Sequence, residues 1–329
     1  MTAFRMIATA LLSGLLFAGT AVAAPSPAGT IEPAYRARLM AAADAPGDSL
    51  SAAVLVPMTR HPSMVPADGA PADAALLAAS DRLLAEALAG ASADWHTAAA
   101  LLLSPWTTID PADQAVLEAA MLARAPDDAF ARLVAIGRAW GEERHADVAA
   151  HIAAGARATE YRSLFGPSAH ALWRRLGEPE TIEGGTFAIA ATAFAIPAYQ
   201  GLAETCRAAT GDLHRDCLAL LARMMRDADT LIDRTLAIEL LARIGDEPLR
   251  AEATALRREH EWRLERFIDR SRALESDSAA MAGYLRQLAH GEVAAQQWLL
   301  ARAGDALDPP ADWVAAADRD RTPAPPALP

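Results

Sequence analysis

The feature that most limits the fold is a pair of cysteines, Cys206 and Cys217, the only two in the chain. Cys206 falls near the end of one predicted helix and Cys217 near the start of the next, with Gly211-Asp212 as turn and N-cap between them. In an antiparallel helical hairpin these positions lie side by side, so the sequence predicts a structural disulfide. Two free thiols or a catalytic pair are the alternatives, although a redox pair is more typically Cys-x-x-Cys. The surrounding stretch predicts three successive helices, at 186–209, 213–227 and 230–244.

The first 23 residues have the three parts of a secretory signal peptide. Arg5 forms the charged region, residues 7–17 an apolar core, and Ala21-Val22-Ala23 a small-residue cleavage site. The apolar core is shorter than the roughly 20 residues that a membrane span needs, which favours a cleaved signal over an uncleaved anchor. We therefore expect a mature periplasmic or secreted protein without membrane insertion, in an oxidising compartment where a disulfide persists.

Composition predicts an all-α fold. Hydrophobic residues make up 53% of the chain, with alanine dominant and only 5% aromatic residues, and alternating β-branched runs are almost absent. The basic residues are all arginine, and the net charge of −12 argues against nucleic acid as a partner.

Proline and glycine divide the chain into short predicted helices. After the signal, residues 24–70 predict a short helix at 32–43, a brief element at 48–56 and a loop from Pro57 onward, because prolines recur there. Pro197 is expected to kink the first helix of the cysteine stretch. The longest helix is expected at 249–274, after Pro248. The predicted organisation is completed by a helical-repeat domain at 71–317, weakly divided near 178–185, and a disordered Pro-rich tail at 318–329.

One segment carries a family resemblance. Residues 125–156 resemble a degenerate tetratricopeptide-type unit, with Pro126 at the inter-repeat turn, Leu133 in the first helix and Ala146, Ala150 and Ala153 in the second. Val134 and Gly137 stand where the family has glycine and tyrosine. The resemblance implies a right-handed superhelix, or solenoid, of antiparallel helical pairs. The whole layout also resembles exported helical-repeat proteins of GC-rich Gram-negative bacteria, and that resemblance implies no activity.

The search for catalytic motifs predicts no catalytic residue, no metal and no cofactor. His260-Glu261 begins a zincin-like string, but Leu264 stands where the second metal ligand is needed, so His260 is interpreted as core-lining. Glu275-Ser276 resembles the catalytic pair of lytic transglycosylases, but the downstream glycine-leucine-methionine-glutamine stretch is missing. His145 and His151 are spaced too far apart to share a helix face and are expected on the surface.

Tryptophan supplies the remaining functional candidates. Trp106 and Trp313 fall in a loop and near the tail, so they are the candidates for contact with a partner. Our first hypothesis is a non-enzymatic scaffold that binds a protein or peptide through a concave surface. A cell-wall-active enzyme or accessory subunit is the second, and a purely structural periplasmic protein is the third.

Overall fold

The computed structural model describes residues 33–60, 73–104, 109–176 and 196–315. Within these ranges the chain forms fourteen α-helices and no strand, so the all-α prediction is confirmed. The first eight helices are α2 (Pro33–Asp44), α3 (Ser49–Arg60), α4 (Ala74–Ala91), α5 (Trp95–Leu103), α6 (Pro111–Arg124), α7 (Ala129–Gly141), α8 (His145–Arg157) and α9 (Phe165–Leu176). They are followed by α11 (Gln200–Ala208), α12 (Gly211–Asp227), α13 (Leu231–Ile244), α14 (Glu247–Ala273), α15 (Ser278–Leu288) and α16 (Glu292–Arg302).

Six of the fourteen described helices begin at an aspartate whose side chain accepts hydrogen bonds from the first free backbone N–H groups of the helix. Each such cap stabilises its helix by about 1 kcal/mol and fixes the residue at which the helix begins. The capping residues of α4, α5, α6, α7, α14 and α15 are Asp73, Asp94, Asp110, Asp128, Asp246 and Asp277.

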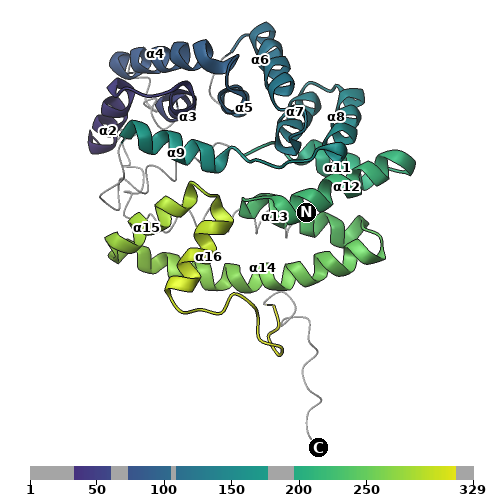
Figure 1. Cartoon of the computed structure of the whole chain (residues 1–329). Coiled ribbons are helices and arrows are strands. Elements are labelled where there is room, and N and C mark those ends of the chain that lie inside the picture. Colours follow the sequence, from purple (N-terminus) through teal and green to yellow (C-terminus); the bar gives the residue numbers. More distant parts are fainter. Residues whose placement is uncertain (1–32, 61–72, 105–108, 177–195, 316–329) are drawn as a thin grey trace, which may run out of the picture.

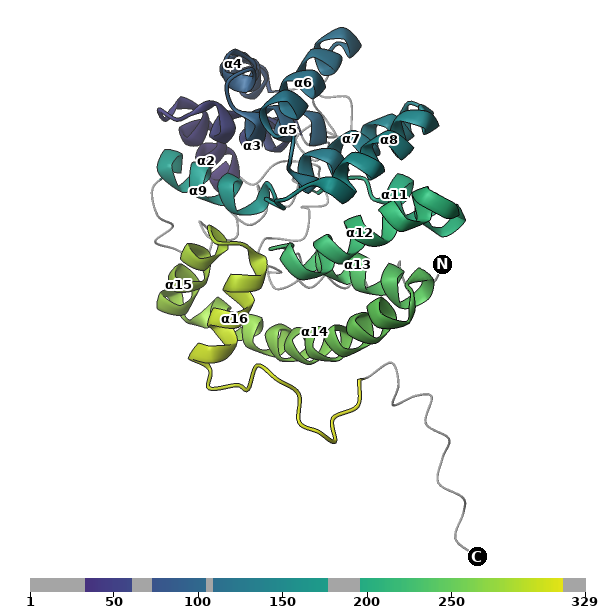
Figure 2. The ribbon, with the colours of Figure 1, turned by 45° about the vertical axis from the view of Figure 1, so that its right-hand side comes forward.

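Most helices that are neighbours in the chain pack together, and α8 packs on α12. In Figure 1 the helices α2 to α8 form an upper layer, α13 to α16 a lower one, and α11 and α12 join the two. Figure 2 shows α12, α13 and the curved α14 stacked in succession. The helix α9 departs from a simple array of pairs, because its main contacts are with α3 and α15. The superhelical arrangement therefore stays a prediction.

Alanine and glycine let the helices approach closely. Residues such as Ala53, Ala98 and Ala135 are fully buried in a core that extends from α2 to α14. Gly201 of α11 lies directly against Trp140 of α7, where an added Cβ would come within 2.6 Å of the Trp140 Cβ. A second apolar cluster joins α9, α14, α15 and α16 around Phe267 and Tyr284.

Two local predictions are wrong. The helix α3 continues through Pro57 to Arg60, although a loop was expected there. Residues 50–59 of α3 are all buried, and this packing outweighs the hydrogen bond that Pro57 cannot donate. Pro197 kinks no continuous helix, because residues 196–199 are not helical and α11 begins only at Gln200.

The predictions for the cysteine hairpin and the longest helix are confirmed. Cys206 of α11 and Cys217 of α12 are bonded, with a Cα–Cα distance of 5.5 Å, and Gly211 makes the turn between the helices at a φ of +59°. The helix α14 spans 27 residues, or about 40 Å. The signal peptide, the junction at 178–185, the tail at 318–329 and Trp106 lie outside the described residues.

Candidate functional site

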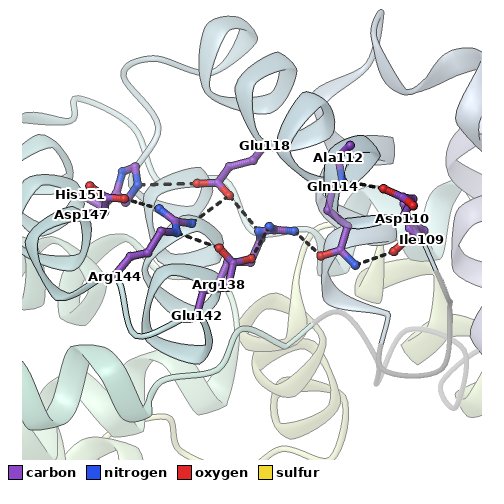
Figure 3. Close-up of polar contacts among 10 residues, drawn as sticks. All are labelled: Ile109, Asp110, Ala112, Gln114, Glu118, Arg138, Glu142, Arg144, Asp147 and His151. Carbon is purple, nitrogen blue, oxygen red and sulfur yellow. Dashed lines mark hydrogen bonds and ion pairs between the residues drawn. The ribbon is translucent and has the colours of Figure 1, made fainter.

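Three groups of polar side chains are candidates for a functional site. The first surrounds Glu118 of α6, which is nearly buried against α7 and α8 (Figure 3). Its carboxylate accepts a hydrogen bond from Arg138 Nε at 2.8 Å and lies 3.6 Å from Arg144 Nη2 and 3.7 Å from His151 Nε2. Arg138 also donates to Gln114, whose amide nitrogen donates to the carbonyl of Ile109. The buried charge is thus fully compensated, and the network joins three helices.

The Glu118 network places His151 differently from its prediction. Its side chain is only 15% exposed and faces Glu118, although the sequence favoured a surface histidine. Burial lowers the pKa of His151, and Arg132 and Arg144 act in the same direction while Glu118 opposes them. Sequence reasoning missed this group because its members are held together across three helices and share no short motif.

The second group consists of carboxylates at the facing N-termini of α13 and α16. Glu292 of α16 accepts a hydrogen bond from the Leu231 backbone N–H of α13 at 2.8 Å. In return, the Val293 backbone N–H donates to the Asp229 carbonyl at 2.9 Å. Asp233, in the first turn of α13, is fully buried and accepts a hydrogen bond from the Tyr199 hydroxyl. Each helix start therefore caps the other, and the positive ends of the two helix dipoles favour the acidic side chains.

Burial raises the pKa of all three acidic side chains in this group. The pKa of Glu292 is raised to about 7, with loss of hydration as the main cause and Asp233 and Asp229 adding to it. The same desolvation raises the pKa values of Asp229 and Asp233. No arginine of the described residues lies within ion-pair distance of these three carboxylates. Nor does any group of three or more acidic, histidine or cysteine side chains in the described ranges have the arrangement of a metal site.

The third group lies on the side of α14 that faces away from α13, where residues 303–315, here called the strap, run along the helix (Figure 1). Arg258 donates hydrogen bonds to the carbonyls of Pro310, Ala311 and Trp313. The Trp262 indole donates to the Ala306 carbonyl at 2.9 Å. Arg263 Nε donates to the Leu307 carbonyl at 2.8 Å. The side chains of α14 thus bind mainly the main-chain carbonyls of the strap.

Two acidic residues and a tryptophan of the strap add side-chain contacts. Asp305 pairs with both nitrogens of the Arg270 fork, at 2.7 and 2.8 Å, and Asp308 lies 3.3 Å from Arg263. Trp313 packs edge-on against Trp262 with ring centroids 5.6 Å apart. As the strap proceeds from 305 to 313 its partners on α14 run back from 270 to 258, so the two segments are antiparallel.

The structure describes one of the two tryptophans predicted to contact a partner. Trp313 is half-buried against Trp262, and its role in partner binding stays a prediction, as does that of Trp106.

His260 lies between α13 and α14, where its Nε2 is 2.7 Å from the Thr235 hydroxyl. No stretch of helix in the described ranges has the length and apolar character needed to cross a bilayer. Residues 311–315, which fall within the predicted helical-repeat domain at 71–317, are irregular.

The fold and these sites define an all-α protein. The side chains of its longest described helix, α14, bind the main-chain carbonyls of the strap. No protein-family model, curated protein sequence or solved structure matches the chain.

Proposed function

We propose that the protein is an exported, non-enzymatic scaffold that binds an extended peptide segment of a protein partner on the strap-bearing side of α14. The observation that carries the proposal is the set of main-chain contacts from Arg258, Trp262 and Arg263 to the strap. Side chains that bind carbonyl groups recognise a chain in a particular conformation and tolerate many sequences. The strap then occupies in cis the surface that a partner segment occupies in trans.

The spacing of the contacts indicates the conformation of the bound segment. From Arg270 to Arg258 the helix rises about 18 Å, at 1.5 Å per residue. The strap covers this distance between Asp305 and Trp313, so it is more extended than a helix of the same length. A partner segment of the same length therefore has to lie extended, without helix of its own.

The side-chain contacts indicate the chemistry of the partner. Arg263 and Arg270 each pair with an aspartate of the strap, and Trp262 packs against an aromatic ring. Guanidinium forks bind carboxylates with defined geometry, and a tryptophan face offers a large apolar contact. We therefore propose an acidic segment with one aromatic anchor as the preferred partner.

A binding experiment tests the proposal on a chain that ends at Arg302. This truncation removes the strap together with its main-chain contacts and leaves the residues of α14 unchanged. A fluorescent peptide of residues 303–315 is then titrated into this truncated chain and followed by anisotropy. We expect saturable binding, and at least about tenfold weaker binding when Arg258→Met is added, because its three carbonyl contacts are lost.

The matched control is Arg257→Met, which removes the same charge from the neighbouring residue. Arg257 points to Glu239 of α13 and makes no contact with the strap among those described. It should leave peptide affinity almost unchanged. The proposal fails if the truncated chain does not bind the peptide, or if Arg257→Met and Arg258→Met weaken binding equally.

A further inference from the structure

A cavity of about 20 Å³ lies between α13, α14 and α16, separate from the contacts that hold the strap main chain except at Arg263. One water needs roughly 10–15 Å³ of such space, so the cavity has room for a somewhat larger guest. Its polar lining is formed by Arg234, Glu259, His260, Arg263 and Gln296, and its apolar lining includes Leu231, Ile238 and Val293.

The positive charge of Arg234 is not compensated at contact distance. Its guanidinium donates to the carbonyls of Ala228 and Arg226, and no carboxylate of the described residues lies within ion-pair distance. Burial and the neighbouring Arg263 lower its pKa, while Asp229 and Asp227 oppose them more weakly from a longer distance. By contrast, Arg263 is paired with Glu259. The cavity therefore carries an excess positive charge.

Gln296 adds an unused hydrogen-bond donor. Its side chain is 1% exposed, and its Nε2 has no hydrogen-bond partner in the part of the chain that the structure describes. A buried donor without a partner costs about 1–3 kcal/mol, which a bound acceptor would offset. His260 is largely neutral near pH 7, because burial and the two arginines lower its pKa to about 4. It can therefore lie beside an anion without adding a second full charge.

We propose that this cavity binds a small monovalent anion of one to three heavy atoms, such as chloride or a formate-sized carboxylate. Arg234 supplies the charge, and Gln296 Nε2 supplies a directed hydrogen bond. The small volume of the cavity favours such anions over the larger sulfate and phosphate. This site is independent of the strap surface, because neither Arg234 nor Gln296 makes a described contact with residues 303–315.

The test follows the side-chain amide signals of Gln296 by nuclear magnetic resonance in the intact protein at pH 7. Sodium chloride and sodium formate are titrated separately against sodium sulfate at constant ionic strength. We expect a saturable shift of these signals with chloride, formate or both, and none with sulfate. The arm that saturates identifies whether the site takes a halide or a carboxylate.

Substitution links the shift to the cavity. Arg234→Met should weaken anion affinity at least about tenfold, because it removes the uncompensated charge. Arg215→Met is the control, since Arg215 is 73% exposed on α12 and removes the same charge from the surface. No saturable shift in the wild-type protein, an equal shift with sulfate, or full affinity in Arg234→Met would overturn the proposal. The wild-type titration decides the question even where Arg234→Met does not fold.

Discussion

Buried charged side chains have different partners in two regions of the molecule. The first region comprises the helices up to α9, and the second comprises the helices from α11 onward. In the first region, Arg138 pairs with Glu118 at 2.8 Å, and Arg175, only 2% exposed, pairs with Glu86 at 3.0 Å. In the second region, Asp233 and Glu292 are buried without an arginine within ion-pair distance among the described residues. Buried arginine charge is directed there to main-chain carbonyls, as at Arg234.

The difference indicates which buried side chains could contact a partner. A buried ion pair with all its hydrogen bonds formed joins helices, and its donors and acceptors are already used. Guanidinium groups that bind carbonyls of an irregular segment can exchange that segment for another of similar conformation. We therefore propose that the second region carries the function and that the first region supports it.

The largest expected effect on stability comes from replacing Arg175 in the first region. The Arg175 side chain donates to the carbonyls of Ala42 and Ala43 and to Glu86, so Arg175→Met strands several buried acceptors. We expect the free energy of unfolding to fall by about 3–5 kcal/mol in urea denaturation. Arg174→Met is the matched control, because Arg174 is 57% exposed beside Asp48 and its loss should cost less than about 1 kcal/mol. Equal losses would show that burial of the pair is unimportant.

The second prediction concerns α11 and α12, at the start of the second region. Replacing both Cys206 and Cys217 by serine removes a covalent link between α11 and α12. Loss of this short loop closure should lower the free energy of unfolding by about 3 kcal/mol, while far-ultraviolet circular dichroism keeps its helical signal. A double variant as stable as the disulfide-bonded protein would contradict the structural role.

The third prediction concerns how the stability of the protein depends on pH through Glu292, in the second region. The folded-state pKa of Glu292 is about 7, against an ordinary value of 4.5 for glutamate in the unfolded chain. Between these values the unfolded state releases a proton that the folded state retains, so stability should fall as pH rises from about 4.5 to 7. The contribution of Glu292 to this loss is at most about 3 kcal/mol.

Glu292→Gln should remove that contribution, because glutamine is neutral throughout and its carbonyl oxygen can still accept from Leu231. The variant should be more stable than the wild-type protein at pH 8 and similar to it below pH 4.5. Glu204→Gln, at an exposed site on α11, is the control and should leave the pH dependence unchanged. A Glu292→Gln profile that runs parallel to the wild-type profile would show that Glu292 is not held protonated.

The sequence predicted the local features and missed the contacts between distant segments. The disulfide and α14 were predictable because caps, prolines and the turn at Gly211 act within a few residues. Glu118 was missed because it meets Arg138 twenty residues away, on another helix. The strap was also missed, since its main-chain carbonyls bind α14 and carbonyl groups carry no sequence signal.

The central claim is that the strap-bearing side of α14 binds main chain, and the indole N–H of Trp262 reports on it directly. In the intact protein this group donates to the Ala306 carbonyl, and Trp262 is 6% exposed. Its hydrogen exchange, measured by nuclear magnetic resonance, should be slow in the wild-type chain and fast in the chain that ends at Arg302, which lacks the Ala306 carbonyl. Adding the peptide of residues 303–315 in trans should restore slow exchange. Exchange that is unaffected by removing the strap, or that the peptide does not slow, would contradict the account.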